Sequence, residues 1–77
     1  MSPKQIAKLQ AGAAICYRNA ENARHRVSKP LKRQREHAQE IGLTADEFVY
    51  GLEQHALAWQ ETAAHTAAMA RQAMGLE

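Results

Sequence analysis

Histidine and glutamate side chains at helical spacing are the first candidates for chemistry in this chain. Two Glu-x-x-x-His pairs, Glu21 with His25 and Glu61 with His65, would each lie on one side of a helix. A catalytic zinc site uses three protein ligands in a fixed geometry, and neither pair has a third. The other two histidines have no such partner. We therefore expect no metal and no cofactor.

Nucleophiles are equally sparse. Both serines, Ser2 and Ser28, lie at predicted helix ends, and the chain has no glycine-rich loop of the kind that binds phosphates. Cys16 lies on a predicted helix-packing face, where a buried thiol is inert. An enzyme needs a nucleophile or general base and a pocket that holds it. Because these patterns are missing, we expect that the protein is not an enzyme.

The single cysteine also bears on location. It cannot form an internal disulfide, which fits a reducing compartment. Apolar runs such as residues 56–59 are far shorter than the roughly 20 residues that a membrane span needs, and the N-terminus has no signal-peptide hydrophobic region. We expect a cytoplasmic protein that does not bind membranes.

Basic side chains are concentrated in one short segment. Residues 1–43 hold nine Lys or Arg against three Glu, a balance of +6, whereas residues 44–77 hold one Arg against five acidic residues, a balance of −4. Six of the ten basic side chains fall within twelve residues, and we call these six the basic elbow. They are Arg24, Arg26, Lys29, Lys32, Arg33 and Arg35. Such a cluster favours an anionic partner.

Two kinds of anionic partner are compatible with the basic elbow. The first is a protein with an acidic surface, toward which complementary charge would speed and orient docking. Apolar side chains near the third helix's start and middle, Tyr50, Leu57 and Trp59, are then expected to act as anchors, with Tyr50, Leu57 and Met69 on an exposed stripe. The alternative is DNA or RNA, contacted through its phosphates. No aromatic side chain is interleaved with the cations, so base stacking is not predicted.

The missing catalytic patterns and the charged segment beside an apolar helix face together favour a binding role. We expect a small regulator or inhibitor of the kind that phages and mobile elements encode. It would mask or bridge a surface of its partner.

Capping signals and apolar spacing predict a first helix over residues 3–28. Ser2 is a suitable N-cap, Pro3 fits the first helical position, and Gln5 follows three residues after the cap. Apolar or small side chains then recur every three or four residues, which predicts a helix-packing face. These are Ile6, Leu9, Ala13, Cys16, Ala20, Ala23 and Val27.

A second, highly charged helix is predicted over residues 30–41. Pro30 disfavours helical backbone at Lys29, so the first helix should end there, and Ser28 or Lys29 should cap the second. Gly42 suits the left-handed position after a helix, with Leu43 packing back onto the helix end. The only apolar contacts expected from this helix are Leu31, Ala38 and Ile41.

A third helix is predicted over residues 45–74, ending at Gly75-Leu76. Thr44 and Glu47 form a Thr-x-x-Glu capping box, with Leu43 and Phe48 placed as a hydrophobic staple. Gly51 marks a kink, a close helix crossing or a merely tolerated glycine. The packing face of this helix is expected to hold Phe48 or Val49, Leu52, Ala56, Trp59, Ala63, Thr66, Ala70, and Ala73 or Met74.

The string from Ala38 to Phe48 is partly similar to the turn of a helix-turn-helix motif. In that interpretation, Asp46 and Glu47 would lie at the start of the recognition helix, where they would repel phosphate. We therefore interpret the string as a capped turn between two helices.

We predict an all-α fold, one domain over residues 1–77, in which two long helices and a short middle helix form a helical hairpin or an open three-helix bundle. At 1.5 Å per residue, the long helices would span roughly 39 and 45 Å and the short one about 18 Å. Sixteen of the 77 residues are alanine, which buries little apolar area. Because the core is thin, we expect a homodimer through the first and third helices.

Overall fold

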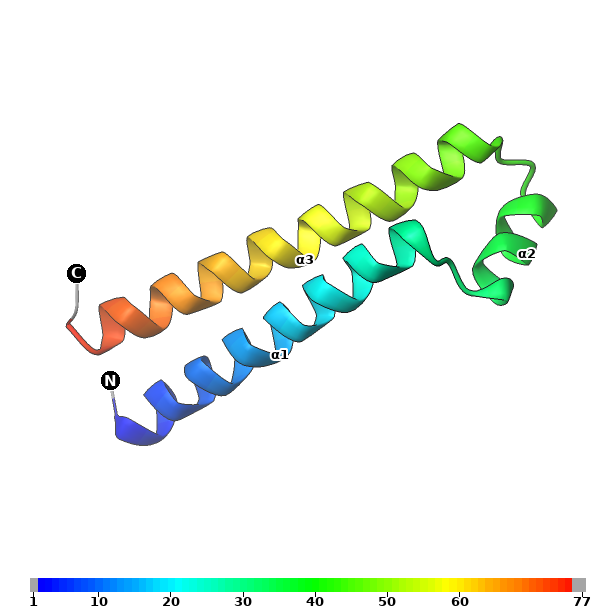
Figure 1. Ribbon diagram of the computed structural model, residues 1–77. Coiled ribbons are helices and arrows are strands. Elements are labelled where there is room, and N and C mark those ends of the chain that lie inside the picture. Colours follow the sequence, from blue (N-terminus) through cyan, green and yellow to red (C-terminus); the bar gives the residue numbers. More distant parts are fainter. Residues whose placement is uncertain (1, 76–77) are drawn as a thin grey trace.

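Two long antiparallel helices form the body of the protein. The computed structural model describes residues 2–75, which hold three helices and no strand: α1 (Pro3–Ser28), α2 (Lys32–Glu40) and α3 (Ala45–Ala73). Helices α1 and α3 run side by side along the length of the molecule, α2 lies across one end, and the chain termini lie at the other (Figure 1). The molecule measures 48 × 19 × 19 Å. The predicted all-α fold is confirmed, and of its two arrangements the helical hairpin is the one observed.

Both predicted capping boxes are present. At the start of α1, the Gln5 N–H donates to Ser2 Oγ at 3.3 Å, and the Ser2 N–H donates to Gln5 Oε1 at 3.1 Å. At the start of α3, the Glu47 N–H donates to Thr44 Oγ1 at 3.2 Å, and the Thr44 N–H donates to Glu47 Oε1 at 2.9 Å. These bonds satisfy N–H groups that have no partner within the helix, which is why both helices begin where the sequence indicates.

The start of α2 differs from the prediction. Lys29 leaves the helix as expected (φ −132°, ψ 73°), but the N-cap of α2 is Leu31 rather than Ser28 or Lys29, and the helix begins at Lys32 rather than at Pro30. Leu31 has extended backbone and no side-chain oxygen that could accept the Gln34 N–H, and only the reverse contact of a capping box is present, in which Gln34 Oε1 accepts the Leu31 N–H at 2.8 Å. The proline therefore lies two residues before the helix.

The end of α2 follows the predicted glycine-terminated pattern. Gly42 has a φ of +77°, and its N–H donates to the Gln39 carbonyl at 3.1 Å, while the Leu43 N–H donates to the Ala38 carbonyl at 2.9 Å. These two bonds define a Schellman motif. Ile41, expected to be an apolar contact, is the C-cap of α2 and is instead 58% exposed.

The core is a seam of small side chains between α1 and α3. Every position of the predicted α1 packing face is buried or half-buried, and the α3 face agrees, with Phe48 and Ala73 on the inner side and Val49 and Met74 more exposed. Among the described residues, Leu52 is the only buried hydrophobic side chain larger than alanine. The buried alanines are Ala13, Ala20, Ala23, Ala38, Ala56, Ala63 and Ala70.

Two glycines show how the helices approach. A Cβ atom built on Gly12 of α1 would lie 3.7 Å from Thr66 Cγ2 of α3, an ordinary contact distance. A Cβ atom on Gly51 would have no atom within 4 Å, so this glycine does not mark a close helix crossing. The predicted end of α3 is also seen, with Gly75 at φ +73°, whereas Leu76 lies outside the described residues.

The length and hydropathy of a helix decide whether it can cross a membrane. None of the helices formed by residues 2–75 combines the length and the apolar character that crossing a bilayer requires.

Candidate partner-binding site

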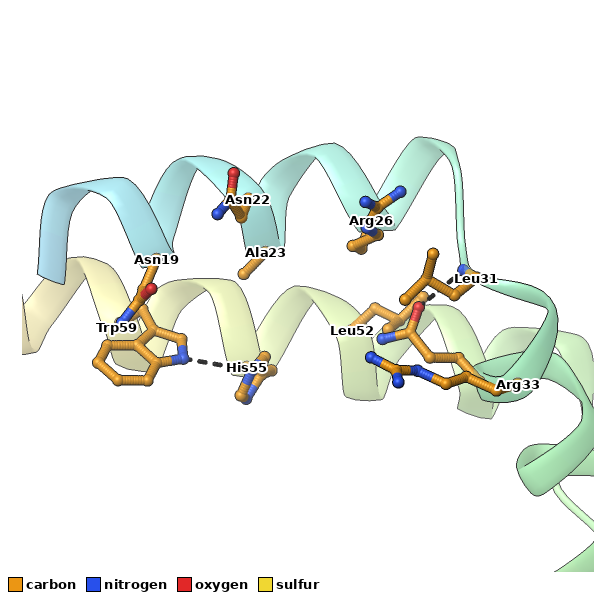
Figure 2. Close-up of a pocket in the computed structure, with 10 residues that line it drawn as sticks. Asn19, Asn22, Ala23, Arg26, Leu31, Arg33, Leu52, His55 and Trp59 are labelled. Carbon is orange, nitrogen blue, oxygen red and sulfur yellow. Dashed lines mark hydrogen bonds between the residues drawn. The ribbon is translucent and has the colours of Figure 1, made fainter. Parts of the chain in front are cut away.

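A cleft of about 300 Å³ lies where the end of α1, the start of α2 and the first half of α3 meet (Figure 2). We call it the elbow cleft. Its apolar lining comes from all three regions: Ala23 of α1, Leu31 at the N-cap of α2 and Leu52 of α3. The antiparallel packing of α1 on α3 brings Ala23 near Leu52, and the turn after α1 brings Leu31 to the same place (Figure 2).

Two arginines of the basic elbow line this cleft. Arg26 comes from the last turn of α1 and Arg33 from the first turn of α2. Arg26 is half-buried, and its guanidinium donates to the Lys29 carbonyl at 3.4 Å, whereas Arg33 is exposed. Within residues 2–75 no Asp or Glu lines the cleft, so its ionic side chains carry one sign only.

Trp59 closes one end of the cleft and is held by a histidine. Its Nε1–H donates to His55 Nε2 at 3.2 Å, and the two rings meet edge to face, with centroids 6.4 Å apart and planes at 87° (Figure 2). The indole is half-buried and also borders a second hollow beside Ala58 and Thr62. No partner was predicted for His55, and in the structure its partner is Trp59.

Side-chain amides complete the edge of the cleft. Asn19 and Asn22 line it from α1, and Gln34 lines it from α2. The Gln34 side chain already accepts the Leu31 N–H, so it belongs to the local structure of the α2 start. An Asn amide offers both a donor and an acceptor, which makes the two asparagines suitable partners for a peptide group.

The remaining cations of the basic elbow point elsewhere. Arg24 lies two residues from Arg26, about 200° around the helix, and lines a groove on the opposite side of the hairpin. Arg35 lines a third hollow, beside Leu43 and Phe48, the two residues predicted to form a staple at the start of α3. The remaining two are exposed lysines, of which Lys32 pairs with Glu36 at 3.8 Å and Lys29 forms the C-cap of α1.

The structure does not bring the three predicted apolar anchors together. Trp59 lines the elbow cleft, whereas Leu57 lies on the opposite side with Arg24. Tyr50 is 62% exposed on the outer side of α3. All three residues of the predicted stripe are exposed, and Tyr50 and Leu57, seven residues apart, lie on the same side of α3, whereas Met69 lies about 100° around the helix from Tyr50 and lines a hollow with Leu9.

Sequence reasoning missed the cleft residues other than the two arginines and Trp59. Leu31, Leu52 and His55 become neighbours of Arg26 and Arg33 only through the register of α1 against α3 and the turn at residues 29–31. One signal was available, since His55 and Trp59 are four residues apart and must lie on the same side of a helix.

One acidic side chain at this end of the molecule has a shifted pKa. Glu47 lies at the start of α3, and the hydrogen bonds from the Thr44 backbone N–H and then with the Thr44 side chain hold the pKa of this carboxyl below its usual range. Within the described residues, no three His, Cys, Asp or Glu side chains are grouped so that they could hold a metal ion.

Comparison with known proteins gives no match to a protein-family model, to a curated protein or to a solved structure.

Proposed function

We propose that this protein binds an acidic surface of a protein partner through the basic elbow. It would act as a small cytoplasmic regulator or inhibitor of the kind that phages and mobile elements encode, and not as an enzyme. The observation that carries the proposal is the ionic state of the elbow. Within residues 2–75, Lys32 is the only one of its six cations in an ion pair, and the other five are not neutralised by the fold.

Unneutralised cations at the end of a narrow molecule suit docking. Charge complementarity increases the rate of encounter and orients the partners, while affinity depends more on buried anchors. The elbow provides both, because Arg26 and Arg33 line the same cleft as Trp59. Trp and Arg are the residue types that most often dominate the binding energy of protein interfaces.

Nucleic acid is a second candidate, and the composition of the elbow cleft favours it. Base stacking was not predicted because no aromatic residue is interleaved with the cations, yet the fold supports it by placing the indole of Trp59 in a cleft with two guanidinium groups. Single-stranded nucleic acids bind to surfaces that combine aromatic side chains with basic groups.

A homodimer through α1 and α3 is a further proposal, which has less support than the two partners above. The packing faces that were expected to hold two copies together are used within one chain, where α1 and α3 cover each other. A second copy would therefore have to dock on the outer sides of the hairpin, where Ile15 and Tyr17 are about half exposed.

Charge reversal tests the leading proposal. A variant with Arg26→Glu, Arg33→Glu and Arg35→Glu should lose capture of a partner from a lysate of the source cells. The matched control reverses three exposed cations away from the elbow, Lys4→Glu, Lys8→Glu and Arg18→Glu, and should keep it. Circular dichroism of both variants shows whether the helices are intact. Unchanged capture by the elbow variant would refute the proposal.

Nuclease treatment and salt separate the two candidates. If digestion of nucleic acid removes the captured proteins, the partner is DNA or RNA. Fluorescence anisotropy of labelled duplex DNA and single-stranded RNA at about 50 and 200 mM salt gives the same answer directly, because phosphate-driven affinity falls steeply over that range. The leading proposal expects no tight binding at the lower salt concentration.

A further inference from the structure

We infer that the elbow cleft is a binding site for a short acidic and apolar peptide segment of the partner. One apolar side chain of that segment lies on Ala23, Leu31 and Leu52 against Trp59, and carboxylates beside it pair with Arg26 and Arg33. This inference rests on the proposed function and adds to it the location of the site and the chemistry of the bound segment.

The apolar part of the cleft is large enough for one side chain. Leu52 is only 9% exposed and Leu31 is half-buried, so the lining is already largely ordered by the fold. A volume of about 300 Å³ lies at the lower end of the range for ligand pockets, which suits one or two side chains better than a large cofactor. The hydrogen bond to His55 holds the Trp59 indole at the end of the cleft, so little side-chain freedom is lost on binding.

The charges around the apolar lining select the neighbours of that side chain. Arg26 and Arg33 come from different helices and both border the cleft. A guanidinium group binds a carboxylate through two parallel hydrogen bonds, and such charge-assisted bonds are stronger than neutral ones. Because no described Asp or Glu lines the cleft, a bound carboxylate would meet no like charge there.

The amides at the edge favour a peptide over an isolated anion. Asn19 and Asn22 each provide a donor and an acceptor, which match the C=O and N–H groups of an extended backbone. Trp59 and the two arginines would also accept a nucleotide, and nucleic acid is therefore a named outcome of the test. The apolar lining by two leucines and an alanine fits an aliphatic or aromatic side chain better than a polar base edge.

The first experiment is selection of binders from a random peptide library displayed on a surface, with the full-length protein as bait. The expected result is a consensus in which one large apolar residue is flanked by Asp or Glu. Each selected peptide is then synthesised and titrated against the protein, with fluorescence of Trp59 as the signal. Trp59 is the only tryptophan in the chain, so the signal reports on this cleft.

Paired variants show whether the cleft is the binding site. Arg26→Gln with Arg33→Gln should weaken the selected peptides by about tenfold or more, because two charge-assisted contacts are removed. Lys4→Gln with Lys8→Gln removes the same charge at the other end of the hairpin and should change affinity less than about twofold. Leu31→Ala, which shortens the apolar lining, should weaken binding without altering its salt dependence.

Three results would overturn the inference. They are selection of no acidic and apolar consensus, equal affinity of the peptides for the cleft variant, and displacement of the peptides by a short oligonucleotide that itself binds more tightly at this site. The inference and the proposed function fail separately. If reversal of the elbow abolishes partner capture while Arg26→Gln with Arg33→Gln leaves it unchanged, only the inference about the cleft is wrong.

Discussion

Thr44 and Glu47 exchange two hydrogen bonds at the start of α3, one in each direction. The Thr44 backbone N–H donates to the Glu47 carboxylate, and this bond is the main reason that the pKa of Glu47 lies below its usual range. The bonded form is the ionised form, which also interacts favourably with the positive end of the helix dipole. Helix α3 is therefore stabilised by a group that titrates.

The sign of the resulting pH dependence follows from the lowered pKa of Glu47. Its stabilising effect is fully present above the pKa of the unfolded chain and is lost as the pH falls through the lower pKa of the folded state, from about pH 5 downward. Glu47→Gln keeps an acceptor oxygen but removes the charge. We expect thermal unfolding of the variant, followed by circular dichroism, to vary less with pH below about 5 than that of the parent protein. Parallel loss of stability in both proteins would contradict this assignment.

Replacing threonine by alanine should have opposite effects on the free energy of unfolding at Thr44 and at Thr62. Thr44→Ala removes the N-cap oxygen and should lower the free energy of unfolding by about 1 kcal/mol. Thr62 is exposed inside α3 and its hydroxyl donates to the Ala58 carbonyl, so Thr62→Ala removes no cap and introduces a better helix former. We expect a gain of up to about 0.5 kcal/mol for Thr62→Ala in urea unfolding. Equal effects of the two changes would refute the role given to Thr44.

At the scale of the elements, a glycine favours a helix end but destabilises a helix interior. Gly42 ends α2 with a φ of +77°, in the left-handed region that a side chain makes unfavourable. Gly51 lies within α3 with no neighbouring atom where its Cβ would be. The first glycine is required by its backbone conformation, whereas the second only weakens the helix.

We therefore predict that Gly→Ala destabilises the protein at one site and stabilises it at the other. Gly42→Ala should lower the free energy of unfolding by about 1 kcal/mol, because alanine is strained in the left-handed region. Gly51→Ala should raise it by about 1 kcal/mol through the higher helix propensity of alanine. Urea unfolding monitored at 222 nm, a helix signal, compares both variants with the parent. Destabilisation by Gly51→Ala would indicate that the glycine has a packing role after all.

Local signals in the sequence account for most of the elements. The capping boxes at Ser2 and Thr44 and the glycine at position 42 act within a few residues, so they could be recognised without knowledge of the fold. The start of α2 could not, because an apolar residue, Leu31, occupies the N-cap and depends on Gln34 for its hydrogen bond. Local chemistry thus predicts where a helix begins when its N-cap residue is polar, and where it ends when a glycine follows it.

The candidate site depends on the register of α1 against α3, and the sequence indicates this register only weakly. Arg26 and Trp59 were both predicted to contribute to binding, but their presence in one cleft depends on how α1 aligns with α3. The fully buried middle of the seam is mostly alanine, and identical small side chains distinguish one alignment from the next only weakly. Leu57 and Trp59 were grouped as anchors, but they lie two residues apart on one helix and so point about 200° apart, to opposite sides of the hairpin, whatever the register.

At the scale of the whole molecule, antiparallel packing places the basic first half of the chain beside the acidic second half. The basic first half and the acidic second half are separated along the sequence, but α1 and α3 lie side by side, so much of that separation runs across the 19 Å width and not along the 48 Å length. The elbow end also contains Glu36, Asp46 and Glu47 beside its cations. A partner would therefore recognise local arrangements such as the elbow cleft rather than a uniformly positive end.

Close approach of the two long helices is the feature on which the whole fold depends. Ala63 is 0% exposed and Ala20 is 1% exposed, and among the described residues no large side chain is fully buried between the helices. Ala63→Leu must therefore separate α1 from α3, and we expect it to lower the free energy of unfolding by about 1–3 kcal/mol. Ala64 is exposed, so Ala64→Leu adds the same atoms outside the seam and should change stability by less than about 0.5 kcal/mol. If urea unfolding shows equal stability for the two variants, the helices are not held together by this alanine seam.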